Sequence, residues 1–121
     1  MPRKMPAFVT DFATQPTTAL TRSICDPQIV EKPYQSTTWR HFSNDQKQLS
    51  AGFWEAGPHK EFCACDYDEL CHLLEGQVRL TDADGNSRTF EAGSTFVVAA
   101  GFKGTWENLT DVRKVYVIVN G

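Results

Sequence analysis

Residues 57–76 read GPHKEFCACDYDELCHLLEG, and no other stretch of the chain carries a pattern as specific. Glycine stands at both ends, and between them lie two cysteines two positions apart, Cys63 and Cys65, followed by Glu69. Side chains at i and i+2 of a β-strand point to the same face of the sheet, so the two thiols share one face. A carboxylate on the next strand can meet them across a short turn. The stretch therefore predicts two adjacent strands whose thiols and carboxylate converge.

A second stretch, residues 93–108, reads GSTFVVAAGFKGTWEN. Its glycines at 93 and 101 supply the special backbone conformations of turns, and the stretch ends at Asn108. Between the two stretches lies an Asp-Gly pair at 84–85, which favours the positive φ of a tight hairpin. The central part of the chain is therefore predicted to be two strand-rich segments joined through a hairpin.

The two stretches resemble the paired motifs of the cupins, G(x)5HxH(x)3E(x)6G and G(x)5PxG(x)2H(x)3N. Every gap has the length of the motif, and both glycines and Glu69 of the first motif are present. Cys63 and Cys65 stand where that motif has histidines. In the second motif, Ala99 replaces the proline and Gly104 replaces the histidine. The resemblance implies an all-β fold, the cupin double-stranded β-helix, which is an RmlC-like jelly-roll barrel.

Shorter segments narrow the resemblance. The segments GFWE at 52–55, DELCHLLEG at 68–76, AGFKGTWE at 100–107 and VRKVY at 112–116 are similar to small single-domain cupins. These are the cupins related to ureidoglycine aminohydrolase and to ethanolamine-utilisation cupins. The resemblance implies a pocket at one end of the barrel, in which the motif positions hold Mn, Fe, Ni or Zn, and often a dimer.

The rest of the sequence agrees with a barrel. Short runs rich in β-branched and aromatic residues alternate with turn signals. They predict nine strands, at 37–42, 48–55, 60–65, 69–74, 77–81, 87–90, 95–98, 105–108 and 112–119. So many short strands indicate a sandwich or barrel, and full closure would also remove exposed strand edges.

Residues 1–33 show no useful periodicity and are predicted to be an irregular N-terminal arm, before a cupin domain at 34–121. The scattered apolar residues of the arm could pack against the domain or against a neighbouring subunit. They are Phe8, Phe12, Leu20 and Ile24.

Length and charge restrict the partners. A chain of 121 residues suits one domain, and its formal net charge is −3 without any Lys/Arg cluster. We therefore expect neither nucleic acid nor a membrane surface as a partner, and we favour a small-molecule ligand. No apolar run has the roughly 18 residues of a membrane span or forms a secretory signal, so a cytoplasmic location with reduced cysteines is expected. A homodimer is the expected oligomer.

The altered motif leaves two interpretations of a metal site open. Cys63, Cys65 and Glu69 remain as metal donors, a mixture that suits Zn better than harder metals, while Gly104 has no side chain to offer. In the other interpretation no cofactor binds, and small apolar thiols fill the space that a metal site has lost. The sequence favours the second interpretation, because no basic residue is placed to deprotonate the thiols.

Two functions follow from these interpretations. The first is a non-catalytic cupin that binds a small molecule at a degenerate metal site. The alternative is an aminohydrolase-like enzyme acting on a small polar or nitrogen-containing metabolite, with Glu69 as its catalytic acid or base. Cys71, two positions after Glu69, and Trp106 join the pocket in either case.

Lys114 is the last candidate for the pocket. The final strand carries Val115, Val117 and Val119 on one face and Lys114, Tyr116 and Ile118 on the other. The valine face suits a core and the lysine face suits a polar cavity, and alternation alone does not choose between them.

Overall fold

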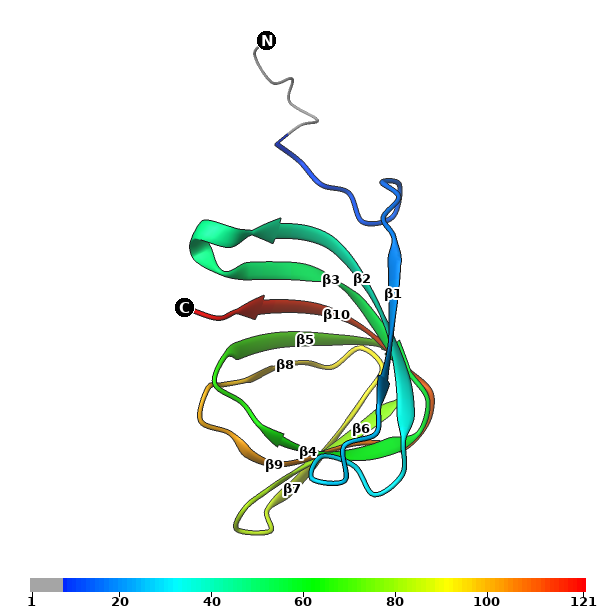
Figure 1. The fold of residues 1–121 in the computed structure, drawn as a ribbon, viewed down its shortest axis with the longest axis vertical. Coiled ribbons are helices and arrows are strands. Elements are labelled where there is room, and N and C mark those ends of the chain that lie inside the picture. The colour runs from blue at the N-terminus through cyan, green and yellow to red at the C-terminus, as the bar shows by residue number, and fades with distance from the viewer. Residues whose placement is uncertain (1–7) are drawn as a thin grey trace.

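The structure, a computed structural model, describes residues 8–121 and is built from antiparallel strands (Figure 1). The strands are β1 (Ala19–Ile24), β2 (Tyr34–Asn44), β3 (Leu49–Ala56), β4 (His59–Ala64), β5 (Asp68–Glu75), β6 (Gln77–Asp82), β7 (Ser87–Glu91), β8 (Thr95–Val98), β9 (Lys103–Asn108) and β10 (Val112–Val119). A 3-10 turn at Asp45–Lys47 joins β2 to β3. All nine predicted strands are present with small shifts at their ends, which confirms the all-β class.

The strands form two sheets that face each other. One has six strands in the order β1-β2-β3-β10-β5-β8, and the other has four in the order β4-β9-β6-β7. The predicted Asp-Gly hairpin joins β6 to β7, where Gly85 has a φ of 86°. Side chains of both sheets line a hollow between them.

The expectation of full closure is wrong in one respect, because within residues 8–121 no continuous ladder of backbone hydrogen bonds joins the two sheets. The linker between β1 and β2 instead covers the free edge of β4. Val30 forms an isolated bridge with Glu61, and the Phe62 amide donates to the carbonyl of Ile29 at 2.8 Å. On the other edge of β4, the Cys65 amide donates to the Phe102 carbonyl at 2.9 Å, which extends the pairing of β4 with β9. Residues of the β1–β2 linker therefore satisfy part of the edge that a closed barrel would have paired.

The position of β10 in its sheet shows which of its two faces points into the hollow. It runs between β3 and β5, and Lys114 pairs with Trp54 on one side and Leu73 on the other. Lys114, Tyr116 and Ile118 point into the hollow, so the valine face points outward. The sequence did not distinguish the two faces because the outer face is also apolar: Val115 lies beside Phe53 of β3.

The N-terminal arm contains one regular element that the sequence did not predict. Strand β1 pairs with β2 from Ala19↔Trp39 to Ile24↔Tyr34. Its side chains are almost all exposed, so it lacks the alternation of buried and exposed residues that predicts a strand. Phe12 of the arm stacks on His41, with 4.8 Å between ring centroids, so this residue of the arm packs against the domain. Residues 1–7 of the predicted arm lie outside the described residues.

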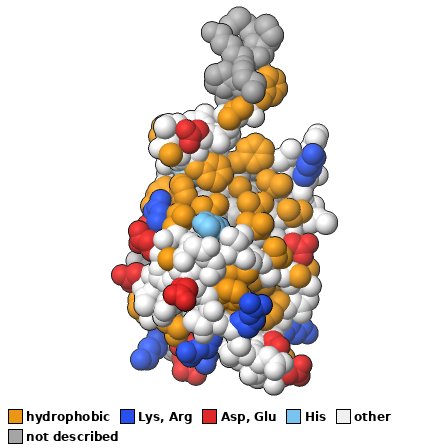
Figure 2. All heavy atoms as spheres, turned by 180° about the vertical axis from the view of Figure 1, so that it is seen from behind, with side chains coloured by type: hydrophobic (Ala, Val, Ile, Leu, Met, Phe, Trp, Pro, Cys, Tyr) orange, Lys and Arg blue, Asp and Glu red, His pale blue; other side chains and the backbone are white. Residues whose placement is uncertain are grey.

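One face of the described part of the chain is rich in exposed apolar side chains. Figure 2 shows hydrophobic side chains gathered on the face opposite to the view of Figure 1, with most of the charged side chains outside that area. On the outer face of the six-stranded sheet, Leu70 and Val97 are paired neighbours, and each is more than a third exposed. No helix within residues 8–121 is long and apolar enough to cross a membrane.

Candidate functional site

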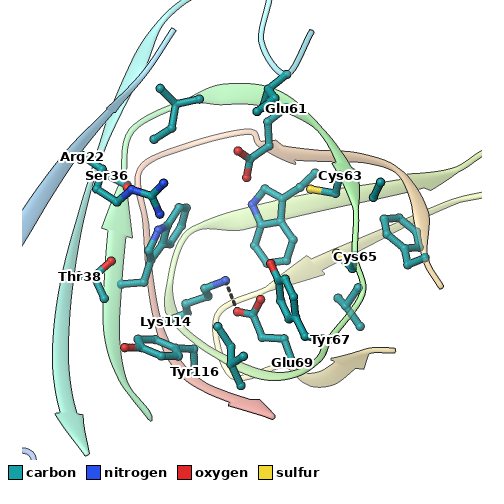
Figure 3. A pocket seen from close by; sticks show the side chains of 18 of the residues that line it. Arg22, Ser36, Thr38, Glu61, Cys63, Cys65, Tyr67, Glu69, Lys114 and Tyr116 are labelled. Carbon is teal, nitrogen blue, oxygen red and sulfur yellow. Dashed lines mark hydrogen bonds and ion pairs between the residues drawn. The ribbon is translucent and has the colours of Figure 1, made fainter. Parts of the chain in front are cut away.

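A cavity of about 450 Å³ lies between the two sheets (Figure 3). Side chains from both sheets line it, and several of them are aromatic or carry a thiol. Its charged lining residues are Arg22, Arg40, Glu61, Glu69 and Lys114. The cavity therefore brings together positive and negative groups that are far apart in the sequence.

Lys114 and Glu69 form an ion pair inside this cavity. The Lys114 Nζ atom donates to Glu69 Oε2 at 2.7 Å, and the two side chains are only 8% and 13% exposed. The ammonium also lies over two indole rings, 4.7 Å from the ring centroid of Trp54 and 4.2 Å from that of Trp106. Such faces attract a cation through their π electrons. One carboxylate and two aromatic faces thus hold a positive charge at the centre of the site.

Lys114 stays protonated in this environment. Burial is the largest single effect and favours the neutral amine, but the charge of Glu69, its hydrogen bond and smaller effects of Cys71 and Glu61 together outweigh burial and raise the pKa of Lys114 above its ordinary value. A permanently protonated amine is not a nucleophile. Lys114 is therefore suited to electrostatic binding rather than to covalent chemistry.

The thiols around the cavity are neutral. Burial, with a smaller effect of nearby Glu61, raises the pKa of Cys63 to about 12. Burial also raises the pKa of Cys71 to about 12, and raises that of Cys65. Cys71 lies behind the cavity wall and donates its S–H to Glu69 Oε2 at 3.3 Å. These groups are small, weakly polar side chains near neutral pH, not thiolates.

The residues present do not fit the divalent metal that the cupin resemblance implies. The carboxylate of Glu69 is engaged by the ammonium of Lys114, and a second cation beside it would be repelled. The thiols are held protonated, whereas metals bind thiolates. Within residues 8–121, no group of three or more His, Cys, Asp or Glu side chains is arranged to hold a metal ion.

A side chain would not fit at Gly104, where the second cupin motif has a histidine. Gly104 on β9 pairs with Asp82 on β6, and a Cβ atom built at Gly104 would lie 2.0 Å from the carbonyl oxygen of Thr81. Real Cβ atoms do not approach backbone so closely, so a side chain here would require β9 and β6 to separate. Gly104 is not among the residues that line the cavity.

The other predicted pocket residues come together. Five of them line the same cavity, namely Cys63, Cys65, Glu69, Trp106 and Lys114. Cys71 contacts this group from behind through Glu69. The residues predicted to share one site are therefore neighbours in space, with Gly104 as the exception.

Glu61 is a site residue that the sequence reading missed. It accepts a hydrogen bond from the Tyr34 hydroxyl at 2.5 Å, and Tyr34 stacks on His59 with 3.5 Å between ring centroids. His59 Nδ1 bonds the Gly57 carbonyl at 2.9 Å, so Nδ1 carries a hydrogen. The other ring nitrogen of His59 is buried without a hydrogen-bond partner, 3.7 Å from Glu61 Oε1. Strand parity could have found Glu61, because it lies two positions before Cys63 and shares its face.

Arg22 and Arg40 were also missed, for a different reason. Arg22 belongs to β1, which was not predicted, and Arg40 lies on the adjacent β2. Nothing in the local sequence connects either arginine with residues 63–71. The pairing of β1 with β2 brings Arg22 into the lining of the cavity, and the pairing of β2 with β3 brings Arg40 there.

Comparisons with known proteins agree with this architecture. A family model for the EutQ-like cupin domain matches residues 44–116. A Pseudomonas syringae protein of unknown function from the DUF861 family is 29% identical to this chain, with a TM-score of 0.73 over 83% of this chain and 44% of that one. The chain thus spans less than half of that relative.

Two EutQ structures share the fold at lower identity. The Clostridium difficile EutQ protein is 19% identical, with a TM-score of 0.64 over 73% of this chain and 64% of that one. A putative ethanolamine utilization protein from Salmonella typhimurium is 18% identical, with a TM-score of 0.63 over 88% and 98%. No curated protein matches the chain. Since the family model covers most of the chain, including both motif stretches, this protein belongs to the EutQ-like cupin domain family.

Proposed function

We propose that this cupin binds a small polar molecule in the cavity between its sheets, without a metal ion, and that the ammonium of Lys114 supplies the positive charge of the site. One observation carries the proposal: Lys114 Nζ lies 2.7 Å from Glu69, the carboxylate that the first cupin motif would offer to a metal. A fixed cation therefore stands beside the surviving motif residue.

The energetics of the pair support a binding role. Two buried charges lose most of their hydration, and their mutual attraction often only offsets that loss, so well-packed apolar residues would stabilise the fold at least as well. An ammonium has three N–H donors, and within residues 8–121 its only hydrogen-bond acceptors are Glu69 Oε2 and the weak acceptor Cys71 Sγ, beside the two indole faces. At least one N–H thus has no hydrogen-bond acceptor and can meet a ligand oxygen in the cavity.

Metal analysis tests the metal-free part of the proposal. Protein purified under reducing conditions is expected to contain less than about a tenth of an equivalent of Zn, Mn, Fe or Ni, because Lys114 and protonated thiols do not favour a divalent ion. Stoichiometric metal that is lost in Cys63→Ser would contradict it.

A thermal-shift screen of small metabolites tests the binding part. We expect at least one polar compound to stabilise the wild type, and to bind at least tenfold more weakly to Lys114→Met. Lys103→Met is the matched control, because Lys103 is exposed on β9 and does not line the cavity. Lys114→Arg keeps the charge and is expected to keep most of the affinity, and Lys114→Gln replaces Lys114→Met if that variant does not fold. Equal affinity for wild type and the variant without the charge, or no stabilising compound, would overturn the proposal.

A second candidate is an aminohydrolase-like enzyme in which Glu69 exchanges protons with a bound metabolite. One observation favours it: both contacts of the Glu69 carboxylate use Oε2, so Oε1 has no hydrogen-bond partner within residues 8–121. A free carboxylate oxygen at the cavity wall can act as a general base. Mass spectrometry of each compound that binds separates the two candidates. Conversion that disappears in Glu69→Gln while binding persists indicates the enzyme, and unchanged compounds indicate the binding protein.

A further inference from the structure

We propose that the cavity recognises a carboxylate through Arg22 and Arg40, and that the same ligand presents a hydrogen-bond-donating nitrogen to Glu61. The inference rests on the proposed function, because it names the class of molecule that the cavity would bind. The expected ligand is thus a small amino or amido carboxylate.

The two arginines come from neighbouring strands at one wall of the cavity. Arg22 of β1 pairs with Ser36 of β2, and both line the cavity together with Thr38 and Arg40. Figure 3 shows the guanidinium of Arg22 beside Ser36, directed toward the interior of the cavity. Two guanidinium groups and two hydroxyl groups therefore share this wall.

Neither arginine has an acidic partner. The ion pairs of lysine and arginine within residues 8–121 join Arg79 to Glu107, Arg113 to Glu55 and Lys114 to Glu69. Arg40 lies against the Tyr116 hydroxyl, which is a neutral group. A guanidinium in a concave site offers a planar fork of N–H donors that matches a carboxylate. Two of them without a carboxylate partner leave this wall open to an anionic ligand group.

The charge balance of the lining selects the type of anion. Lys114 and Glu69 neutralise each other, which leaves Arg22 and Arg40 against Glu61, a local net charge of +1. The whole chain has a formal net charge of −3, so this positive charge is a property of the cavity rather than of the protein. A carboxylate group brings a charge of −1 to this wall and balances it, whereas a phosphate dianion would bring a charge of −2 to the same wall.

Glu61 supplies the second recognition element. Its Oε2 accepts the Tyr34 hydroxyl, and its Oε1 has only the nearby ring nitrogen of His59 at 3.7 Å, which is beyond a hydrogen bond. Within residues 8–121, Oε1 therefore has no donor at hydrogen-bond distance. An ammonium or amide N–H of a ligand would fill that position, and a ligand with both groups would use both walls.

A set of probes with equal chain length tests the inference. The probes are 5-aminopentanoate, glutarate, 1,5-diaminopentane and 1,5-pentanediol, with inorganic phosphate as a further anion. Binding is measured by NMR titration at pH 7.5 against wild type, Arg22→Gln, Arg40→Gln and the double variant. Arg79→Gln is the control, since Arg79 pairs with Glu107 and does not line the cavity.

We expect 5-aminopentanoate to bind best and glutarate next, and the diamine and the diol to bind at least tenfold more weakly. Loss of one charge-assisted contact corresponds to about a tenfold weaker Kd, so each single arginine variant is expected to lose about that factor and Arg79→Gln none. Glu61→Gln is expected to weaken 5-aminopentanoate but not glutarate.

Three results would overturn the inference. They are equal binding of diamine and aminopentanoate, tighter binding of phosphate than of either carboxylate, and unchanged affinity in the Arg22/Arg40 double variant. If the diol or diamine binds and Lys114→Met abolishes that binding, the proposed function stands and only the carboxylate assignment fails. If no probe and no metabolite in the wider screen binds, both fail.

Discussion

Lys114 distinguishes this site at the scale of single residues. Its ammonium contacts Glu69, Cys71 and two indole rings, and its side chain is only 8% exposed. A buried ammonium of this kind has a fixed position and a charge that does not depend on pH in the neutral range. The cavity therefore carries its own cation, and the remaining charged residues are arranged around it.

The first prediction concerns the energetics of the pair. Lys114→Met leaves the buried carboxylate of Glu69 without its partner, and such a loss costs about 3–5 kcal/mol of unfolding free energy. Replacing both residues by methionine removes both buried charges, so the double variant is expected to be more stable than Lys114→Met. Urea unfolding at pH 7 of the wild type, both single variants and the double variant measures the coupling. Additive effects of the two single changes would show that the pair does not interact.

The second prediction concerns the cysteines. Cys25 is exposed, whereas Cys63 and Cys71 are held protonated with a pKa of about 12. At pH 8 a thiol with that pKa is about 0.01% thiolate, and the thiolate is the reactive form. Iodoacetamide is therefore expected to label Cys25 at least tenfold faster than Cys63 or Cys71 in the folded protein, as measured by peptide mass spectrometry. Labelling in urea is the reference for the unprotected cysteines. Comparable native rates for Cys25, Cys63 and Cys71 would contradict the burial of the last two thiols.

At the scale of elements, the close approach of β9 and β6 prevents a single substitution at position 104 from restoring a metal site. Their backbones approach so closely at Gly104 that a Cβ would meet the Thr81 carbonyl oxygen at 2.0 Å and the Asp82 Cα at 2.9 Å. The close approach belongs to the pairing of two strands, not to one side chain. Any residue other than glycine at 104 therefore changes the position of a strand.

The third prediction follows from this contact. Gly104→Ala is expected to lower the unfolding free energy by about 1–3 kcal/mol, the usual cost of forcing extra atoms into a packed region. Gly57→Ala is the matched control, because a Cβ there meets only Asp111 Oδ1, at an ordinary 3.5 Å. The two variants are compared by urea unfolding. Equal stability of both would show that β9 can move away from β6 at little cost.

The elements differ in how far the sequence could predict them. Strands β4 to β9 follow from motif spacing and turn residues, and they brought Cys63, Cys65 and Glu69 to one site. Strand β1 could not be predicted, because an exposed edge strand lacks the burial pattern on which such predictions depend. The inward face of β10 could not be predicted either, since both of its faces are largely apolar. Arg22 and Lys114 depend on those two strands, so the charges of the cavity became clear only in three dimensions.

At the scale of the whole molecule, the groups with raised pKa values are concentrated around one cavity. Burial raises the pKa of Cys63 and Cys71 to about 12, and raises the pKa values of Tyr34, Tyr67 and Tyr116 as well. Thiols and phenols are neutral when protonated, so the folded state holds their protons more tightly than the unfolded state does. The ammonium of Lys114 changes in the same direction, since Glu69 raises its pKa. All of these groups therefore make the stability depend on pH in the same sense.

The fourth prediction is a loss of stability at alkaline pH. A group whose pKa is raised on folding contributes its full share of stability below its unfolded pKa. It loses that stability progressively as the pH rises above that value, here from about pH 9 for the thiols. Above that pH, each thiol lowers the free energy of unfolding by about 1.4 kcal/mol per pH unit, so Cys63 and Cys71 together lower it by about 2.7 kcal/mol per unit. The tyrosines and Lys114 lower it further above about pH 10. Since a small domain has about 5–15 kcal/mol in total, the protein is expected to unfold near pH 11.

Circular dichroism melts between pH 7 and pH 11 measure this loss as a fall in Tm. The Tm is expected to be nearly constant from pH 7 to 8.5 and to fall steeply above pH 9. Cys63→Ser removes one titrating thiol from the cavity wall, so its Tm should fall less steeply above pH 9 whatever its value at pH 7. A Tm that stays constant to pH 10.5, or a slope that Cys63→Ser leaves unchanged, would mean that water reaches the cavity groups freely and that their protons are not held by the fold.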